Sequence, residues 1–261
     1  MGAGDTKHWK AFDSKLNHHT SSAADGSGGK CLNRCEGRKP NCSCSHTWQG
    51  YLKAKDNREL YDWPKYEGIG AQTLMYRRKA QEGQSATVRR RVRAPRAHDW
   101  DVDKPCPRNG KINFLESAST PYYHEGHHMV PNSVLNSTIS DLFGKPESLL
   151  ILFRKGLMDE EYNLNYKINM IILPLEAVIA DALQLPRHRE LSAFDHKTYS
   201  KKVKNKLKKV LSANQQDIRN HDNPKYSACK AQIEALSTSL FKQIVKAGHV
   251  GTLNEMKIRF R

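Results

Sequence analysis

The sequence predicts a mixed α+β fold in which helices dominate. After residue 110, stretches with the residue pattern of strands and of amphipathic helices follow one another in the order strand, helices, strand, helices. Before residue 110 the chain is irregular and basic, and one short stretch is rich in cysteine. Prolines and an Asn-Gly pair over residues 97–110 mark the change. We therefore expect an accessory region with a linker-like start over residues 1–110, and a folded domain over residues 111–261.

Two short strands are expected in the folded domain. Residues 122–130 have the composition of a strand that enters a turn at Pro131. Residues 168–173, Ile-Asn-Met-Ile-Ile-Leu, form an apolar run that we expect to end before Pro174, because proline lacks the backbone N–H of a ladder.

Apolar residues at helical spacing predict four helices, over residues 132–143, 146–155, 197–211 and 224–247. Asn132 or Ser133 is expected to cap the first helix, since short polar side chains accept hydrogen bonds from a helix N-terminus. Gly156 is expected to end the second helix and Gly248 to end the last.

Composition restricts the class of partner. The chain has 261 residues, 43 of them Lys or Arg and 27 Asp or Glu, so its formal net charge is +16. No stretch approaches the roughly 20 apolar residues that span a bilayer. The first residues lack the apolar segment of a secretory signal peptide. Such an excess of positive charge predicts a polyanionic partner, nucleic acid before a membrane surface.

Four of the six cysteines and one histidine fall within sixteen residues: Cys31, Cys35, Cys42, Cys44 and His46. Zn²⁺ prefers sulfur and imidazole ligands, so one interpretation of this cysteine cluster is a structural zinc site in the N-terminal region. Free or oxidisable thiols and local disulfides are the other two. The remaining cysteines stand alone and are expected to be buried or incidental thiols.

The strongest chemical signal is a set of histidines in the second domain. Residues 123–131 have the sequence Tyr-His-Glu-Gly-His-His-Met-Val-Pro. Adjacent residues at a strand end point to opposite sides, so one of His127 and His128 can face a metal while the other faces the attacking water. Further along the chain come Asn169 before Ile-Ile-Leu-Pro, then His188, then His196 in a His-Lys-Thr-Tyr sequence.

In this order, these residues resemble the HNH/endonuclease VII superfamily of ββα-metal nucleases, and within it the AHH group found among bacterial polymorphic toxins. That group has Ala-His-His followed by Pro, a later Asn with Leu-Pro, a further His, and His-x-x-Tyr. Gly126 stands here in place of the alanine. The resemblance covers about residues 120–212, and it implies a ββα-metal core with additional helices.

The resemblance also implies roles for the histidines. His128 would be the general base, because an imidazole is largely neutral at physiological pH. His127 and His196 would hold one divalent cation, with His188 as a third ligand; His127 and His128 could also exchange roles. Asn169 would hold the loop between the strands in register or hydrogen-bond His128. The cation would be Mg²⁺ or Zn²⁺, with Mn²⁺ and Ni²⁺ as alternatives.

Basic residues gather in two places, an arginine-rich segment over residues 77–96 and the lysine-rich helix that follows His196. The first can be a phosphate-tracking arm or a solvated charge run. In the family, the metal-bearing helix lies against the minor groove, which gives the lysines a part in backbone contact. The residues expected to contact nucleic acid are Arg89, Arg90, Arg91, Arg93, Lys167, Arg187, Arg189, Lys201, Lys204 and Lys208, although Lys167 and the last two arginines could equally be solvated charges.

Together these observations lead us to expect a metal-dependent, largely non-specific DNase of the antibacterial effector kind. The resemblance implies secretion without a cleavable signal, action in the cytoplasm of a target cell, and an immunity protein that inhibits the enzyme in the producer. The net charge predicts that this inhibitor is acidic. The alternatives are an RNase of the same fold, a site-specific endonuclease of a mobile element, and a non-catalytic, zinc-containing DNA-binding protein.

Overall fold

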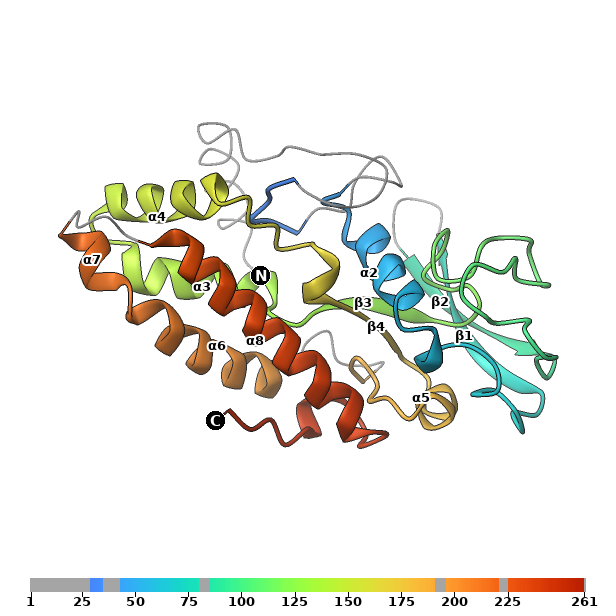
Figure 1. Ribbon diagram of the computed structural model, residues 1–261. Helices are drawn as coiled ribbons and strands as arrows, with labels where there is room; N and C mark the ends of the chain where they lie inside the picture. The colour runs from blue at the N-terminus through green and yellow to red at the C-terminus, as the bar shows by residue number, and fades with distance from the viewer. Residues whose placement is uncertain (1–28, 35–42, 80–84, 191–195, 221–224, 261) are drawn as a thin grey trace. The chain divides into compact units, whose positions relative to one another are not determined.

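The computed structural model describes residues 29–34, 43–79, 85–190, 196–220 and 225–260 (Figure 1). Over these residues the fold is mixed α+β, as predicted, with seven α-helices and two small antiparallel sheets. None of the helices in the described ranges is long and apolar enough to cross a membrane.

The elements alternate along the chain. Before residue 110 the chain forms α2 (His46–Lys55), β1 (Gln72–Lys79) and β2 (Ser85–Val92). After residue 110 it forms β3 (His124–His128), α3 (Asn132–Phe143), α4 (Glu147–Asp159), β4 (Met170–Pro174), α5 (Ala177–Leu183), α6 (Lys197–Ser212), α7 (Gln215–Arg219) and α8 (Tyr226–Ala247). Short 3₁₀ turns lie at Arg58–Leu60, Lys167–Asn169 and Leu253–Glu255.

The chain divides into two compact units, each built from three stretches. One contains Met1–Gln49, Val130–Asn169 and Val203–Ser237, and the other Gly50–Met129, Met170–Lys202 and Thr238–Arg261. Both units therefore draw on residues from either side of residue 110, where the sequence suggests a boundary; that boundary stays a prediction.

The first unit has a core between helices α3 and α4, which lie side by side in Figure 1. The Phe143 and Phe153 rings stack at a centroid distance of 4.2 Å. A fully buried arginine, Arg154, donates to the Asn136 side-chain oxygen at 2.9 Å. Burial of these rings ties the two helices together, because each removes a large apolar area from water.

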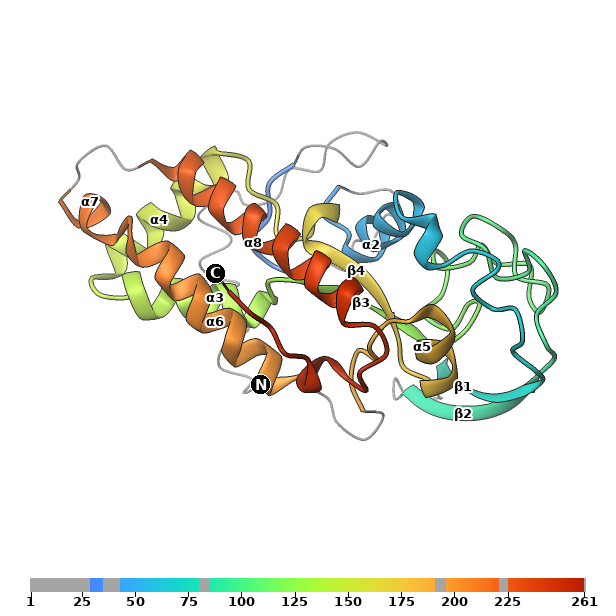
Figure 2. The ribbon, with the colours of Figure 1, turned by 60° about the horizontal axis from the view of Figure 1, so that its bottom comes forward.

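The second unit contains both sheets. Strands β3 and β4 pair antiparallel, and all five residues of β4 are buried. Rings of Tyr66, Trp100, Phe114 and Tyr122 pack against one another beside this sheet at centroid distances of 5.2–6.0 Å. The β1–β2 hairpin forms a separate curved ribbon, with α5 near it in Figure 2.

The predicted helices over 132–143, 197–211 and 224–247 are confirmed to within two residues. The prediction that Gly156 ends the second helix was wrong, because α4 continues to Asp159. Gly156 is buried, and a Cβ at this position would overlap the Tyr226 ring. The glycine permits close packing and does not stop the helix.

The strand limits and the first helix cap also differ from the prediction. Residue 131 is the cap of α3, an extended proline without a side-chain hydrogen bond, so neither Asn132 nor Ser133 takes that place. Strand β3 spans only His124–His128. Strand β4 starts two residues later than expected and includes Pro174, whose carbonyl still accepts a hydrogen bond although its nitrogen cannot donate.

Candidate metal centre and active site

The β3–β4 register sets the positions of the two adjacent histidines. His127 lies opposite Ile171 and His128 opposite Met170, so their side chains point to opposite faces of the strand. Both are buried, with exposed fractions of 2% and 7%. The sheet therefore separates them, as the strand pattern predicts.

Backbone contacts bring the two distant histidines to the same sheet. The His188 backbone nitrogen donates to the Pro174 carbonyl at 2.9 Å, which fixes it at the end of β4. His196 directly precedes α6, and its carbonyl accepts the Ser200 backbone nitrogen. The Tyr199 hydroxyl donates to the Met129 carbonyl at 2.7 Å and holds the first turn of α6 at the end of β3. Two strands and the start of a helix thus converge, the ββα arrangement that the family resemblance implies.

Three imidazoles meet at this point. One ring nitrogen from each of His127, His188 and His196 lies within 4.8 Å of the others. The Nδ1 of His127 is 3.1 Å from the Nε2 of His188. Two nitrogens bound to one tetrahedral Zn²⁺ lie roughly 3.3 Å apart, given metal–nitrogen bonds of about 2.0–2.1 Å. Over the described ranges, no other group of three His, Cys, Asp or Glu side chains comes as close.

One ring nitrogen of His127 faces His188, and the other has no hydrogen-bond partner among the described residues. The Nε2 of His127 is buried, and no donor or acceptor in the described part of the chain lies within hydrogen-bond distance of it. Burial, followed by the neighbouring His196, His188 and His128, lowers the pKa of His127 well below its usual value. The neutral ring keeps a lone pair for a cation, so these three residues fit a divalent metal site.

Glu125 is a further residue of the candidate site, and the sequence motifs did not indicate it. Its Oε2 lies 2.7 Å from the Nδ1 of His188, and its Oε1 accepts from the Arg189 guanidinium at 2.8 Å. Burial alone would raise the pKa of Glu125, but the bonds from His188 and Arg189 outweigh it and hold the pKa well below the usual range. A carboxylate on one nitrogen fixes the ring so that the other nitrogen can face a metal.

A signal for Glu125 was present in the sequence. It precedes His127 by two residues, so both side chains lie on the same face of β3. A carboxylate on the same strand face as a candidate metal ligand is a candidate hydrogen-bond partner for the ligand histidines.

The side-chain amide of Asn169 has four hydrogen bonds. Its oxygen accepts from the Val130 backbone nitrogen and the Ser237 hydroxyl, both at 2.8 Å. Its nitrogen donates to the Val130 and Leu164 carbonyls at 3.1 and 2.9 Å. These bonds use both donors and both lone pairs of the amide. They favour the role of holding the backbone after β3 over that of orienting an imidazole.

The predicted phosphate contacts fall into two groups. Arg187 pairs with Glu190, Arg189 with Glu125, Arg93 with Asp99, and both Lys204 and Lys208 lie within 4.0 Å of Asp141. Arg189 is turned inward, with only 12% of its side chain exposed, so its position is that of a support for Glu125. Arg89, Arg90, Arg91 and Lys201 are exposed, and Lys167 is half-buried.

The predicted zinc site lies only partly within the described residues. Cys31, Cys44 and His46 are buried in the first unit. The His46 Nε2 is 3.3 Å from the Arg34 guanidinium. Cys35 and Cys42 lie outside the described residues, and the zinc site stays a prediction. Elsewhere, Cys106 and Cys229 are buried, as expected.

Comparison with known proteins bears on the domain that carries the three histidines. Residues 109–235 match the model of the AHH family, described as a nuclease family of the HNH/ENDO VII superfamily with conserved AHH. No curated protein and no solved structure gave a significant match to the chain. The match includes Glu125 and all three clustered histidines, and it confirms the resemblance that the sequence motifs indicated. Residues 109–235 are therefore an AHH domain, a nuclease domain of the HNH/endonuclease VII superfamily.

Proposed function

We propose that the protein is a metal-dependent endonuclease that hydrolyses DNA with little sequence preference. The observation that carries this proposal is the cluster of His127, His188 and His196, with a buried, unpartnered nitrogen, inside a nuclease domain. Only histidines form the cluster, so its donor set favours Zn²⁺ or Ni²⁺ by affinity over Mg²⁺, which prefers oxygen ligands.

Each side chain has a separate task in this proposal. His127, His188 and His196 hold the cation, and Glu125 keeps the His188 ring in place. A cation held there would supply the fixed positive charge needed to polarise the scissile phosphate and to stabilise the departing 3′ oxygen. His128, on the other face of β3, accepts the proton of the attacking water. Asn169 keeps the backbone that follows these histidines in register.

The basic surface supports a nucleic-acid substrate without strong base recognition. The net charge is +16, and exposed arginines lie in a row on β2. Contacts between such side chains and phosphates provide affinity that is largely independent of sequence. DNA is the preferred substrate in this proposal, and RNA is the first rival because the same metal–imidazole pair can act on RNA.

The biological setting follows from the same likeness. We propose that the protein is an antibacterial effector, secreted without a cleavable signal peptide through a secretion-system component and active in the target cytoplasm. A cognate immunity protein would protect the producer. An acidic inhibitor suits a chain of charge +16, because complementary charge speeds association.

A cleavage assay tests the activity. Pure protein is incubated with plasmid and with total RNA, with several divalent metals or with chelator. We expect metal-dependent loss of plasmid as a smear, and a loss of activity of at least a hundredfold in His128→Ala, because a positioned general base contributes about 10²–10⁴-fold. His249→Ala, at a half-buried histidine paired with Asp181, is the matched control.

Other outcomes would change the proposal in defined ways. Degradation of RNA alone would replace DNase by RNase. Discrete bands would indicate a site-specific endonuclease. DNA binding with no cleavage under any metal would favour the non-catalytic DNA-binding protein, and unchanged cleavage by folded His128→Ala would remove the proposed base.

A further inference from the structure

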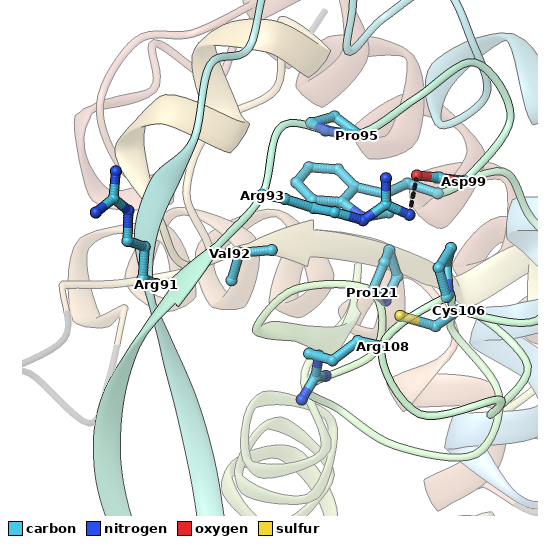
Figure 3. Close-up of a pocket in the computed structure, with 10 residues that line it drawn as sticks. Arg91, Val92, Arg93, Pro95, Asp99, Cys106, Arg108 and Pro121 are labelled. Atoms are coloured by element: carbon cyan, nitrogen blue, oxygen red, sulfur yellow. Dashed lines mark ion pairs between the residues drawn. The ribbon is translucent and has the colours of Figure 1, made fainter.

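A cavity of about 270 Å³ lies at the C-terminal end of β2, in the second unit. Its walls are largely apolar, formed by Val92, Pro95, Trp100, Cys106 and Pro121. None of the three clustered histidines lines it. In Figure 3, Val92, Cys106 and Pro121 face the middle of the cavity. We call it the β2 pocket.

The walls of the β2 pocket are held in shape from behind. The Trp100 ring packs edge-on against Tyr66 and Tyr122, at centroid distances of 5.2 and 5.7 Å. The Asn113 side chain donates to the carbonyls of Asp99 and Asp101, at 3.1 and 2.9 Å, on either side of this tryptophan. A pocket that is fixed before binding loses little conformational entropy when a ligand enters.

The rim of the β2 pocket is cationic. It contains Arg91, Arg93 and Arg108 against a single carboxylate, Asp99, which pairs with Arg93 at 3.0 Å. Arg91 has no acidic partner among the described residues. Figure 3 shows the guanidinium groups of Arg91 and Arg108 turned outward, away from the apolar walls. The pocket thus combines largely apolar walls with the Arg93–Asp99 ion pair and with two further arginines at its rim.

We propose that the β2 pocket holds one unpaired nucleobase of the nucleic-acid substrate, while Arg91 and Arg108 contact the phosphates on either side of that nucleotide. This inference rests on the proposed nuclease function and names the form of substrate that β2 binds. Bases have flat apolar faces and phosphates are anionic, so the two chemistries of the pocket match the two parts of a nucleotide. A paired base inside a duplex cannot enter, which restricts the ligand to single strands, ends or opened steps.

The rest of β2 supports this assignment. Arg89 and Arg91 alternate with Arg90 along the strand, and all three side chains are exposed. Residues two apart on one face of a strand are about 6.6 Å apart, a spacing that suits successive phosphates of an extended chain. A single-stranded nucleic acid that binds these arginines along β2 would therefore reach the β2 pocket at the C-terminal end of β2. Charge complementarity and continuity with this arginine row both point to a nucleic acid as the occupant.

The test is equilibrium binding to the full-length protein by fluorescence anisotropy, with chelator present so that no cleavage occurs. The probes are a labelled oligothymidylate and an abasic oligonucleotide of the same length and charge. We expect the wild type to bind the thymidylate about tenfold more tightly, because stacking of one base is worth about 1–3 kcal/mol. Val92→Phe should fill the cavity and abolish that preference while leaving abasic binding unchanged.

Val88→Phe is the matched control. It makes the same substitution on the same face of β2, four residues from Val92, and Val88 does not line the β2 pocket. It should keep the tenfold preference. An iodouracil-containing oligonucleotide provides a second measurement without any variant, and photo-crosslinks are expected at Trp100 or Cys106.

Equal affinity of the wild type for the two oligonucleotides would overturn the base pocket, as would crosslinks that map only outside its walls. Retention of the preference in folded Val92→Phe would also overturn it. In each of these cases plasmid cleavage by the wild type leaves the proposed nuclease standing. A wild type that neither binds nor cleaves nucleic acid would refute both proposals.

Discussion

At the scale of single residues, the contact between Glu125 and His188 orients one of the three histidines of the candidate metal site. The carboxylate accepts from the ring at 2.7 Å on one oxygen, while Arg189 occupies the other. An imidazole held in this way presents a fixed nitrogen to a cation, and the charge behind it makes the ring a better donor. Neither Glu125 nor Arg189 needs to touch substrate for this to matter.

We expect Glu125→Gln to weaken metal binding by roughly 10–100-fold, the range found when partners of metal-binding histidines are replaced. The amide keeps the shape of the side chain but loses the negative charge that faces His188 and Arg189. Calorimetric titration with Zn²⁺ or Mn²⁺, without nucleic acid, measures the affinity. Circular dichroism checks that the variant is folded.

Glu190→Gln is the control for this experiment. Glu190 also pairs with an arginine beside His188, but its side chain is 48% exposed and it faces Arg187. Its replacement should leave metal affinity within about twofold, since exposed ion pairs contribute little. Equal affinities of Glu125→Gln and the wild type would show that the carboxylate does not support the metal site.

At the scale of elements, the packing of α4 decides the effect of a substitution that helix propensity alone would misjudge. Ala is favoured over Gly in a helix by about 1 kcal/mol. At Gly156 we expect the opposite, a net loss of about 1–3 kcal/mol in Gly156→Ala, because the new methyl group would overlap the Tyr226 ring. Chemical denaturation measures the change in the free energy of unfolding.

The double variant Gly156→Ala/Tyr226→Ala identifies the cause. With the ring removed, alanine at position 156 should become neutral or stabilising relative to Tyr226→Ala alone, so the two changes are not additive. Additive losses would mean that contacts other than the Tyr226 ring account for the effect.

The sequence predicts an element well when the residues that stabilise it lie close together in the chain. Helices α6 and α8 could be predicted because apolar residues such as Leu207 and Ile233 repeat at helical spacing and are buried where expected. The close packing at Gly156 and the hydrogen bonds of Asn169 before β4 could not, since their partners Tyr226 and Val130 lie in distant parts of the chain. Tertiary contacts override local preference at both places.

The same distinction applies to the site. Motif order indicates His127, His188 and His196 as ligands, and the structure brings these three together. Their adjacency depends on the Pro174 carbonyl and on the first turn of α6, neither of which motif spacing shows. The sequence pattern also indicates Arg189 as a phosphate contact, because a one-dimensional pattern cannot show that Glu125 lies beside it.

At the scale of the whole molecule, the basic side chains behind the net charge of +16 differ in whether they are paired with acidic residues. Several basic side chains are paired with acids, whereas the β2 row of Arg89, Arg90 and Arg91 is exposed. Exposed cations that bind phosphates release counterions, so their number is measurable from the salt dependence of binding. The net charge alone does not show which side chains contact the phosphates.

We expect simultaneous replacement of Arg89, Arg90 and Arg91 by alanine to make the slope of log affinity against log salt shallower by about 2–3 for DNA, at roughly 0.9 per phosphate contact. The control removes three exposed lysines elsewhere, Lys242, Lys246 and Lys257. Its slope should change by less than 1. If the slope becomes shallower by the same amount in both triple variants, overall charge and not the β2 row accounts for the salt dependence of binding.

The cluster of three imidazoles has a further consequence if it binds a cation as proposed. His127 and His188 are 61 residues apart in the chain, and their nitrogens meet only because β4 and α6 are in place. An unfolded chain has no such cluster, so the cation binds the native form preferentially and shifts the folding equilibrium toward it by mass action. If the proposed site binds a metal, the concentration of that metal would set the fraction of molecules in the native form, and an unfolded chain would carry no bound ion.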